Sequence, residues 1–382
     1  MSNGTSGGSK LNCGINARRL GGQRLGMGRY IEYLLKYWEE MSLPSDRFTL
    51  YIREPLGKNG PHLSKAFTSE LLQPKLTGLL WENLLLPRHA REVDVLFGPS
   101  YTVPLAYRGR CVVAIHSLNE AQPGTHPWWY GLTYSPLYRL SAQHAHTVIV
   151  PSQSVKQDMQ EHYGIATDKI EVVPLGVDDS FRPIEDVDLL RSTRQRYLGT
   201  DQPYILLVDK LSERRNIPLL LEAFAVLKKR HKIPHRLLLF GPNHLNLPLE
   251  RMASELGISD SVVQTDGLVT EHWELVPIYN AADLYVLPSS YEGFSLPILE
   301  AMACGIPVLT TNRAALAEIA SGYALLVDDL TVEALSDAMA RALNDPQLRQ
   351  HLRARGLERA RSFRWEDTAR RTLELLRKVA HA

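Results

Sequence analysis

Two glutamates eight positions apart, Glu292 and Glu300, stand in the segment SSYEGFSLPILEAMACGIPVLTT. The apolar run LYVLP precedes this segment, so its first residues are predicted at the carboxyl end of a buried strand, where open α/β sheets bind ligands. A helix is predicted to follow, with Ser295 as its N-cap and Gly305 after its end. The N–H groups of a helix start suit a diphosphate, and carboxylates accept hydrogen bonds from sugar hydroxyls. The spacing therefore predicts a site for a nucleotide sugar.

The same pair of glutamates could instead be two solvated charges beside a core helix. The coincidence of a strand end, the turn at residues 293–295 and a helix start favours the binding site. A second charged group, Lys210, Arg214 and Arg215, stands in VDKLSERRNIPLLLEAF, which has the pattern of a strand, a loop and a helix. Cations in such a loop can stabilise a departing diphosphate, although a solvated loop is the alternative.

The elements that must position these residues recur along both halves of the chain. The apolar runs of the first half are NCGIN, RFTLYI, VDVLFG, CVVAIH, TVIVPS and IEVVPLG, and those of the second half are YILLV, RLLLFG, SVVQT, LYVLP, PVLTT and ALLVD. Runs that are apolar on both faces are typical of parallel strands covered by helices on two sides. Helical periods separate them, as after Met27 and Asn216. The pattern predicts two doubly wound, Rossmann-like α/β domains.

The domain boundaries follow from this alternation. We expect a first domain at residues 11–178 and a second at residues 179–365, joined through the polar segment 176–203. The C-terminal stretch RWEDTARRTLELLRKVAHA is an amphipathic helix with no strand after it, so we expect residues 366–382 to return to the first domain and bury Leu373, Leu375 and Leu376. The first ten residues are polar and glycine-rich, and they are predicted to be a disordered leader.

Composition limits the classes of function. The chain has 382 residues, 44% of them apolar and 22% charged, with a net charge of +1, which fits a globular protein and argues against nucleic acid as a partner. The three cysteines stand in no metal-ligand spacing, and this favours a reducing, cytoplasmic compartment. No apolar run approaches the roughly 20 residues of a membrane span, and peripheral association with the inner membrane face stays open.

The first segment resembles the E-x7-E signature of the retaining glycosyltransferases of family four, in the form E-G-F-x-L-P-x-x-E-A-M-A-x-G-x-P-V, and the similarity covers nearly the whole chain after residue ten. The resemblance implies the GT-B fold of two facing Rossmann-like domains. It also implies a nucleoside-diphosphate sugar donor of the GDP-mannose or UDP-glucose type. The acceptor would be a saccharide or lipid-linked saccharide hydroxyl, and the product linkage would be α. We expect no metal cofactor, because the cations of the Lys210–Arg215 loop take its place.

By the same resemblance, Glu292 contacts the transferred sugar, Glu300 contacts the ribose, and the backbone between them contacts sugar and phosphate. Lys210 and Arg215 correspond to the family's basic pair, which is commonly Arg first and Lys second and is reversed here. The pair keeps its total positive charge, but the arginine, which can form two parallel hydrogen bonds, now stands at the second position of the pair. The sequence leaves open whether Arg214 or Arg215 points inward. The implied donor-binding set is Gly26, Met27, Gly28, Gly293, Phe294, Ser295, Leu296, Glu300, Gly241 and Val269.

Further candidate residues lie in the first half. The family commonly has His-Asp at the end of the CVVAIH run, with the histidine beside the donor sugar. This chain has His116 followed by Ser117, so the orientation of the histidine stays open, and a structural role is the alternative. The loop GGQRLGMGRY is expected to close on the donor phosphates in this family, although it also reads as a plain turn. Trp128 and Trp129, in HPWWYGLTYSPLY, are the acceptor candidates; a core edge or a membrane contact are the alternatives.

The chain also contains a D-x-D motif, and two other functions are compatible with the predicted fold. Asp186 and Asp188 spell the D-x-D signature of metal-dependent glycosyltransferases, but they stand ahead of a predicted helix and away from any strand end, so we interpret them as helix-start residues. A nucleotide-sugar epimerase of the same fold would need acid and base groups around the sugar instead of an acceptor site. A non-catalytic sugar-nucleotide-binding scaffold is disfavoured by the presence of both glutamates and the basic pair.

Overall fold

The computed structural model describes residues 10–21, 26–42, 44–56, 66–121, 128–267, 269 and 271–382, and for residues 128–132 it describes the backbone alone. The chain forms two compact units. The first contains the described residues up to 121 together with 128–176 and 365–382, and the second contains those from 177 to 364.

Parallel strands form the sheet of the first unit, in the order β3-β2-β1-β4-β5-β6-β7. The bounds are β1 (Asn12–Asn16), β2 (Arg47–Ile52), β3 (Phe67–Leu71), β4 (Val95–Gly98), β5 (Cys111–Ala114), β6 (Thr147–Val150) and β7 (Ile170–Val172). The order reverses beside β1, which lies between β2 and β4. Such a switch point is where doubly wound sheets bind ligands at the carboxyl ends of their strands.

The prediction found every strand of this sheet except β3. In the sequence FTSEL of β3 only Phe67 is buried, because the strand pairs on one side only, with β2, at the sheet edge. An edge strand lacks the two-sided apolar pattern on which the prediction relied.

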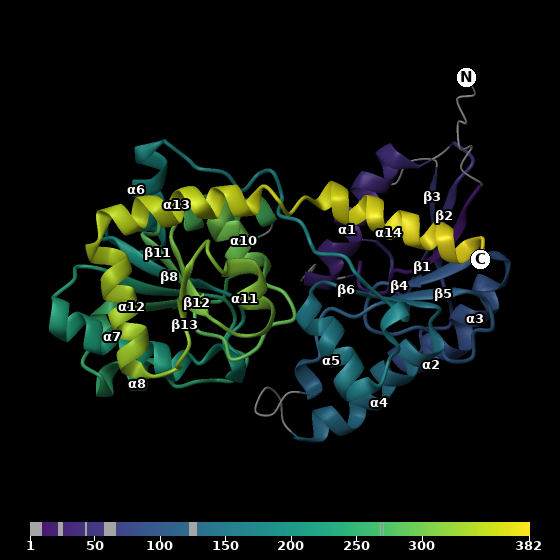
Figure 1. Ribbon diagram of the computed structural model, residues 1–382, viewed down its shortest axis with the longest axis horizontal. Helices are drawn as coiled ribbons and strands as arrows, with labels where there is room; N and C mark the ends of the chain where they lie inside the picture. Colours follow the sequence, from purple (N-terminus) through teal and green to yellow (C-terminus); the bar gives the residue numbers. More distant parts are fainter. Residues whose placement is uncertain are drawn as a thin grey trace. The chain divides into compact units, whose positions relative to one another are not determined.

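Helices cover both faces of the first sheet, with α1 and α14 side by side on one face and α4 and α5 on the other (Figure 1). C-terminal helix α14 thus packs within the first unit, as the fold prediction expected. It is tied there by the Trp38 indole, which donates to the Ala369 carbonyl at 2.8 Å, and it buries Leu373 and Leu376, while Leu375 is only half-buried. The bounds are α1 (Gly26–Met41), α2 (Gly78–Leu80), η1 (Trp81–Leu85), α3 (Leu86–His89), η2 (Ala90–Glu92), η3 (Asn119–Ala121), α4 (Trp128–His144), α5 (Gln153–Tyr163), η4 (Thr167–Lys169) and α14 (Trp365–Ala380).

The sheet of the second unit is also parallel, in the order β10-β9-β8-β11-β12-β13, and all of its strands coincide with predicted runs. The strand bounds are β8 (Tyr204–Val208), β9 (Arg236–Phe240), β10 (Val262–Thr265), β11 (Leu284–Leu287), β12 (Val308–Thr311) and β13 (Leu325–Val327). Here the order reverses between β8 and β11, and both of these strands are buried along their whole length.

Helices pack on both faces of the second sheet, with α7 against α12 and α10 against α13 (Figure 1). The bounds are α6 (Val187–Leu198), η5 (Glu213–Arg215), α7 (Ile217–His231), α8 (Leu249–Glu255), η6 (Ser259–Ser261), η7 (His272–Glu274), α9 (Leu275–Asn280), α10 (Leu296–Ala303), α11 (Ala314–Ala320), α12 (Val332–Asn344) and α13 (Pro346–Ala360). Across the described part of the chain, no helix combines the length and apolar character that a membrane crossing requires.

The polar segment 176–203 belongs mostly to the second unit, since its helix α6 packs against α9. The carboxylate of Asp186 caps α6 by accepting a hydrogen bond from the Leu189 N–H at 3.0 Å. This geometry agrees with the interpretation of Asp186 and Asp188 as helix-start residues.

Candidate active site

The charged residues of the second unit meet because their loops follow neighbouring strands. Strand β8 is followed by Asp209 and the short helix η5, and β11 is followed by the loop that carries Glu292. Two hydrogen bonds join these loops: the Ser290 N–H donates to the Arg214 carbonyl at 2.9 Å, and the Asn216 side-chain amide donates to the Pro288 carbonyl at 2.7 Å. Asn216 has a left-handed backbone (φ 52°), which asparagine tolerates better than most residues. The two loops therefore form one connected edge at the carboxyl ends of β8 and β11.

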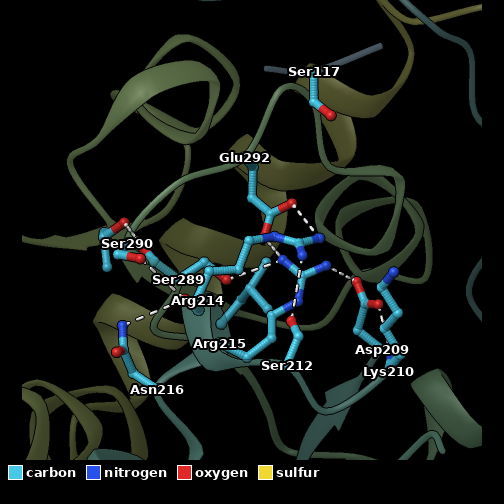
Figure 2. A network of polar contacts seen from close by, with 12 residues as sticks. Ser117, Asp209, Lys210, Ser212, Arg214, Arg215, Asn216, Ser289, Ser290 and Glu292 are labelled. Atoms are coloured by element: carbon cyan, nitrogen blue, oxygen red, sulfur yellow. Dashed lines mark hydrogen bonds and ion pairs between the residues drawn. The ribbon is translucent and has the colours of Figure 1, made fainter. Parts of the chain in front are cut away.

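Glu292 pairs with two buried arginines, Arg214 and Arg215 (Figure 2). Arg214 donates from Nε at 3.3 Å and from Nη2 at 3.5 Å to the two carboxylate oxygens, and Arg215 forms a second ion pair with the same carboxylate. Relative exposures are 5% for Glu292, 6% for Arg214 and 3% for Arg215. The question left open by the sequence is thus answered, because both arginines point inward.

The arginine pair is itself held from the β8 side. Arg215 pairs with Asp209 and donates to the Ser289 hydroxyl at 3.0 Å, so its guanidinium bridges two carboxylates (Figure 2). Burial lowers the pKa of Arg215 to about 10, and the charge of Asp209 opposes that shift. The group therefore stays charged at neutral pH. Lys210 is exposed beside Asp209, so Arg214, and not Lys210, completes the buried pair of cations.

Glu300 has different partners. Its Oε2 accepts a hydrogen bond from the Tyr279 hydroxyl at 2.8 Å, and its Oε1 lies 2.9 Å from Nε2 of His272. Burial, followed by the charge of Glu300, raises the pKa of Tyr279 well above its usual value, so the phenol keeps its proton and donates. Neither Tyr279, from α9, nor His272, from η7, was singled out in the sequence, because no local motif marks a partner that reaches Glu300 by helix packing.

Helix α10 begins at Leu296, as predicted, and Gly305 follows its end with φ 74°. Ser295 occupies the N-cap position, but within the described residues its side chain makes no capping hydrogen bond, so the predicted side-chain cap is wrong. Gly293 and Ser295 are buried, while Phe294 and Leu296 are half-buried. The turn thus presents the start of the helix without a side-chain cap, directly after Glu292.

Two donor candidates lie at other strand ends of the same sheet. Gly241 follows β9, and a β-carbon there would collide with the carbonyl oxygen of Asp209, so only glycine permits this approach of the two loops. Gly241 therefore helps to place Asp209. Val269 is half-buried and packs against the core of the second unit.

In the first unit, the orientation of His116 is now defined. Its Nε2 lies 2.9 Å from the Pro99 carbonyl and therefore donates to it, and its ring stands edge-on to Tyr30 with 4.7 Å between ring centroids. Burial lowers the pKa of His116, which favours the neutral ring, protonated at Nε2 and unprotonated at Nδ1. The neighbouring Ser117 hydroxyl lies 2.9 Å from the Tyr101 hydroxyl, so the serine does not orient the histidine in the way an aspartate would.

The remaining candidates also belong to the first unit. Gly26, Met27 and Gly28 form the first turn of α1, and residues 22–25 before them lie outside the described residues. Trp128 and Trp129 open α4, and their side chains are likewise outside the described part of the chain. Their predicted roles in phosphate and acceptor binding stay predictions.

Comparison with known proteins matches both units of the chain. The family model described as Glycosyltransferase Family 4 matches residues 25–181, and the one described as Glycosyl transferases group 1 matches residues 191–359. O-antigen chain mannosyltransferase B of Escherichia coli is 28% identical over 280 residues, which is 73% of each chain. D-inositol 3-phosphate glycosyltransferase of Corynebacterium urealyticum is 34% identical over 246 residues, 62% of this chain and 57% of that protein.

The fold has solved counterparts. The structure of HepE from Anabaena, in complex with UDP and glucose, matches 96% of this chain and 99% of its own with a TM-score of 0.76 at 16% identity. At this identity the likeness shows the fold, which agrees with the two parallel-sheet units described above. Since the two family models match most of both units, the chain belongs to glycosyltransferase family 4 and is a glycosyltransferase of the GT-B fold.

Proposed function

We propose that the protein transfers a hexose, with retention of its α configuration, from a nucleoside-diphosphate sugar to a hydroxyl of a glycan or lipid-linked saccharide. Several relatives are named mannosyltransferases, and HepE was solved with UDP and glucose, so GDP-mannose and UDP-glucose are the donors to test first. A role in polysaccharide assembly fits the relative named for the O-antigen chain. The free, buried cysteines Cys13, Cys111 and Cys304 suit a reducing cytoplasm, where we place the reaction.

One observation carries the proposal: Glu292 is clamped by Arg214 and Arg215 immediately before the start of α10. A diphosphate gains negative charge as the sugar leaves, and fixed cations in a site with little water stabilise that charge strongly. Asp209 and Glu292 neutralise part of the cationic charge, and exposed Lys210 adds to it. The edge therefore combines an anion-binding helix start with cations whose positions are set before the substrate arrives.

This clamp bears on the mechanism. A carboxylate paired with two guanidinium groups is a poor nucleophile, because the two positive charges compensate its negative charge, although its oxygens can still accept hydrogen bonds from hydroxyls. We therefore favour a displacement on one face of the sugar without an enzyme-bound intermediate. The bond from C1 to the diphosphate oxygen breaks and the bond from C1 to the acceptor oxygen forms on the same face. The acceptor proton passes to the departing phosphate oxygen.

In this scheme the two glutamates divide the donor between them. Glu292 accepts hydrogen bonds from hydroxyls of the transferred hexose, and Glu300 accepts them from the ribose hydroxyls. Ionised carboxylates suit both tasks, since they are strong acceptors for hydroxyl donors. The backbone from Gly293 to Leu296 lies next to the sugar and diphosphate.

A donor panel tests the proposal. Calorimetry with GDP-mannose, UDP-glucose and the free nucleotides identifies the donor, because a ligand that binds only the folded state also raises the midpoint of thermal unfolding. The preferred donor is then incubated with saccharide acceptors, and the anomeric configuration of the product is read by NMR. An α-linked product from an α-linked donor supports the proposal. A β-linked product contradicts retention, release of an epimerised sugar points to an epimerase, and binding without turnover points to a scaffold.

A further inference from the structure

Tyr101 adopts a backbone conformation that tyrosine rarely takes. Its φ is 70°, in the left-handed region where a β-carbon is crowded, and it stands in the loop that follows β4 at the switch point of the first sheet. Such strain persists only where the surrounding structure enforces it, and it concentrates at functional sites. We infer that Tyr101 is a specificity-determining residue of the acceptor site and that, with Tyr138 and Tyr134, it forms an aromatic face for a sugar ring of the acceptor. This inference rests on the proposed transferase function.

The turn around Tyr101 is fixed from several sides. Its N–H donates to the Ala114 carbonyl of β5 at 2.9 Å, which ties the turn to the neighbouring strand. A β-carbon at Gly98 would collide with the Thr102 carbonyl, so the chain doubles back tightly there. The Thr102 hydroxyl in turn donates to fully buried Glu82 at 2.8 Å, and Arg18 pairs with the same carboxylate. The left-handed backbone is thus held in place by buried polar contacts.

The aromatic face joins the turn to helix α4. The rings of Tyr101 and Tyr138 have centroids 4.8 Å apart with 30° between their planes, and the ring of Tyr134 follows at 6.0 Å from Tyr138. Tyr134 is 37% exposed, and Tyr138 is half-buried. Aromatic rings that carry hydroxyls offer an apolar surface and a polar tip together, which suits a pyranose with its C–H face and its hydroxyl rim.

Polar groups beside this face favour a saccharide over a lipid chain. The hydroxyls of Tyr101 and Ser117 lie 2.9 Å apart, so two groups that can both donate and accept hydrogen bonds stand beside the ring of Tyr101. Among the described residues, the buried Ser100 hydroxyl and Asn16 carboxamide oxygen, at the carboxyl ends of adjacent strands β4 and β1, have no hydrogen-bond partner. Unpaired buried polar atoms are costly and call for a ligand or water, whereas an acyl chain would satisfy none of them.

The test uses glycine because it separates strain from side-chain function. Tyr101→Gly relieves the left-handed backbone and removes the ring, so the fold should lose little from the backbone change. Lys232→Gly is the matched control: Lys232 also has a left-handed backbone (φ 49°) and ends helix α7 in the second unit. Tyr101→Phe keeps the ring and removes the hydroxyl. Tyr101→Asn, which tolerates positive φ, replaces the glycine variant if that variant fails to fold.

We expect Tyr101→Gly to raise the acceptor KM by about three- to tenfold, the loss of one aromatic contact, while the donor Kd stays unchanged. Tyr101→Phe should show a smaller rise, and Lys232→Gly should match the wild type. Tyr134→Ala should raise the acceptor KM more than Tyr134→Phe does if the ring stacks on the sugar.

Two outcomes overturn the inference. An unchanged acceptor KM in folded Tyr101→Gly removes Tyr101 from the acceptor site, and an equal loss of donor affinity assigns it to the donor instead. Either result leaves the transferase proposal intact, because both are measured on an enzyme that turns over. If the wild type forms no glycoside with any donor and acceptor, the proposed function fails first and the inference fails with it.

Discussion

Glu292 and Glu300 are eight residues apart and similarly buried, at 5% and 4% exposure, yet their surroundings differ in kind. Glu292 is held by two guanidinium groups, whereas Glu300 is held by a phenol and an imidazole. The first arrangement places several fixed charges where the diphosphate would leave. The second arrangement orients the Glu300 carboxylate without placing permanently charged cations around it.

Under the proposed function, the two glutamates of this one motif have separate tasks. An electrostatic task needs charges that are fixed before the reaction, because their value lies in stabilising charge that appears only in the transition state. A binding task needs an acceptor of defined direction, which the hydrogen bond from Tyr279 and the contact with His272 supply. Variants at the first glutamate should therefore affect kcat, and variants at the second should affect donor affinity.

The largest effect is expected for Glu292→Ala. Its removal takes away the acceptor for the transferred sugar and leaves Arg214 and Arg215 without their shared partner, so kcat should fall by about 100- to 1,000-fold, the range typical of electrostatic groups at reacting centres. Breaking a buried ion pair costs about 3–5 kcal/mol, so unfolding must be measured beside kinetics. Glu292→Gln, which keeps the shape, is the matched variant. Turnover of Glu292→Ala at the wild-type rate would refute the assignment.

The second effect concerns Glu300→Ala. Loss of a charged acceptor for the ribose should weaken donor binding by about 10- to 100-fold while kcat at saturating donor changes little. Calorimetry with the intact donor and with its 2′-deoxy analogue measures this. The analogue should bind the wild type more weakly and should bind Glu300→Ala nearly as well as the intact donor does. A fall in kcat of Glu300→Ala without a change in donor affinity would contradict the assignment of separate tasks to the two glutamates.

Much of this site could be predicted because it is encoded locally. The strands β8 and β11, the start of α10 and the loop with its arginines are continuous stretches whose apolar runs and turn residues identify them. The partners of Glu300 could not be found in the same way. Tyr279 and His272 reach it because α9 and η7 lie close to α10 in the folded unit, and that proximity has no local sequence pattern.

The first unit shows the same limit. Tyrosine itself does not favour the left-handed backbone of Tyr101. The tight turn at Gly98 and the hydrogen bond from the Tyr101 N–H to the Ala114 carbonyl enforce it. Strand β3 escaped prediction because an edge strand with one partner needs no apolar second face. Local sequence patterns therefore predict most helices and strands. Which side chains contact one another depends on the packing of elements that are distant in the sequence.

A smaller effect is expected for Tyr279→Phe. The change removes one hydrogen bond to Glu300 and keeps the ring in its buried position, so donor affinity should fall by about three- to tenfold, the worth of one such bond. Tyr204→Phe is the matched control, because Tyr204 is an equally buried tyrosine of the second unit whose hydroxyl donates to the Ile278 carbonyl. If both variants weaken the donor equally, the effect reflects general stability, and Tyr279 has no special role in aiming Glu300.

The smallest effect is expected from removing divalent metal. Arg214 and Arg215 already supply buried positive charge beside Glu292, and the D-x-D residues Asp186 and Asp188 serve the start of α6. Over the described ranges of the chain, no cluster of three or more His, Cys, Asp or Glu side chains is arranged to hold a metal ion. We propose that transfer is independent of metal because the two buried arginines supply the positive charge that a metal ion would otherwise provide. The rates of metal-stripped enzyme with and without excess chelator should then agree within about twofold, a difference in barrier below 0.5 kcal/mol. Arg215→Lys, which keeps the charge and loses the bidentate fork, should lower the rate under both conditions. A complete loss of activity in chelator that added Mg²⁺ or Mn²⁺ restores would show that the arginines do not suffice, and the electrostatic task assigned to the Glu292 side would then belong in part to a bound ion.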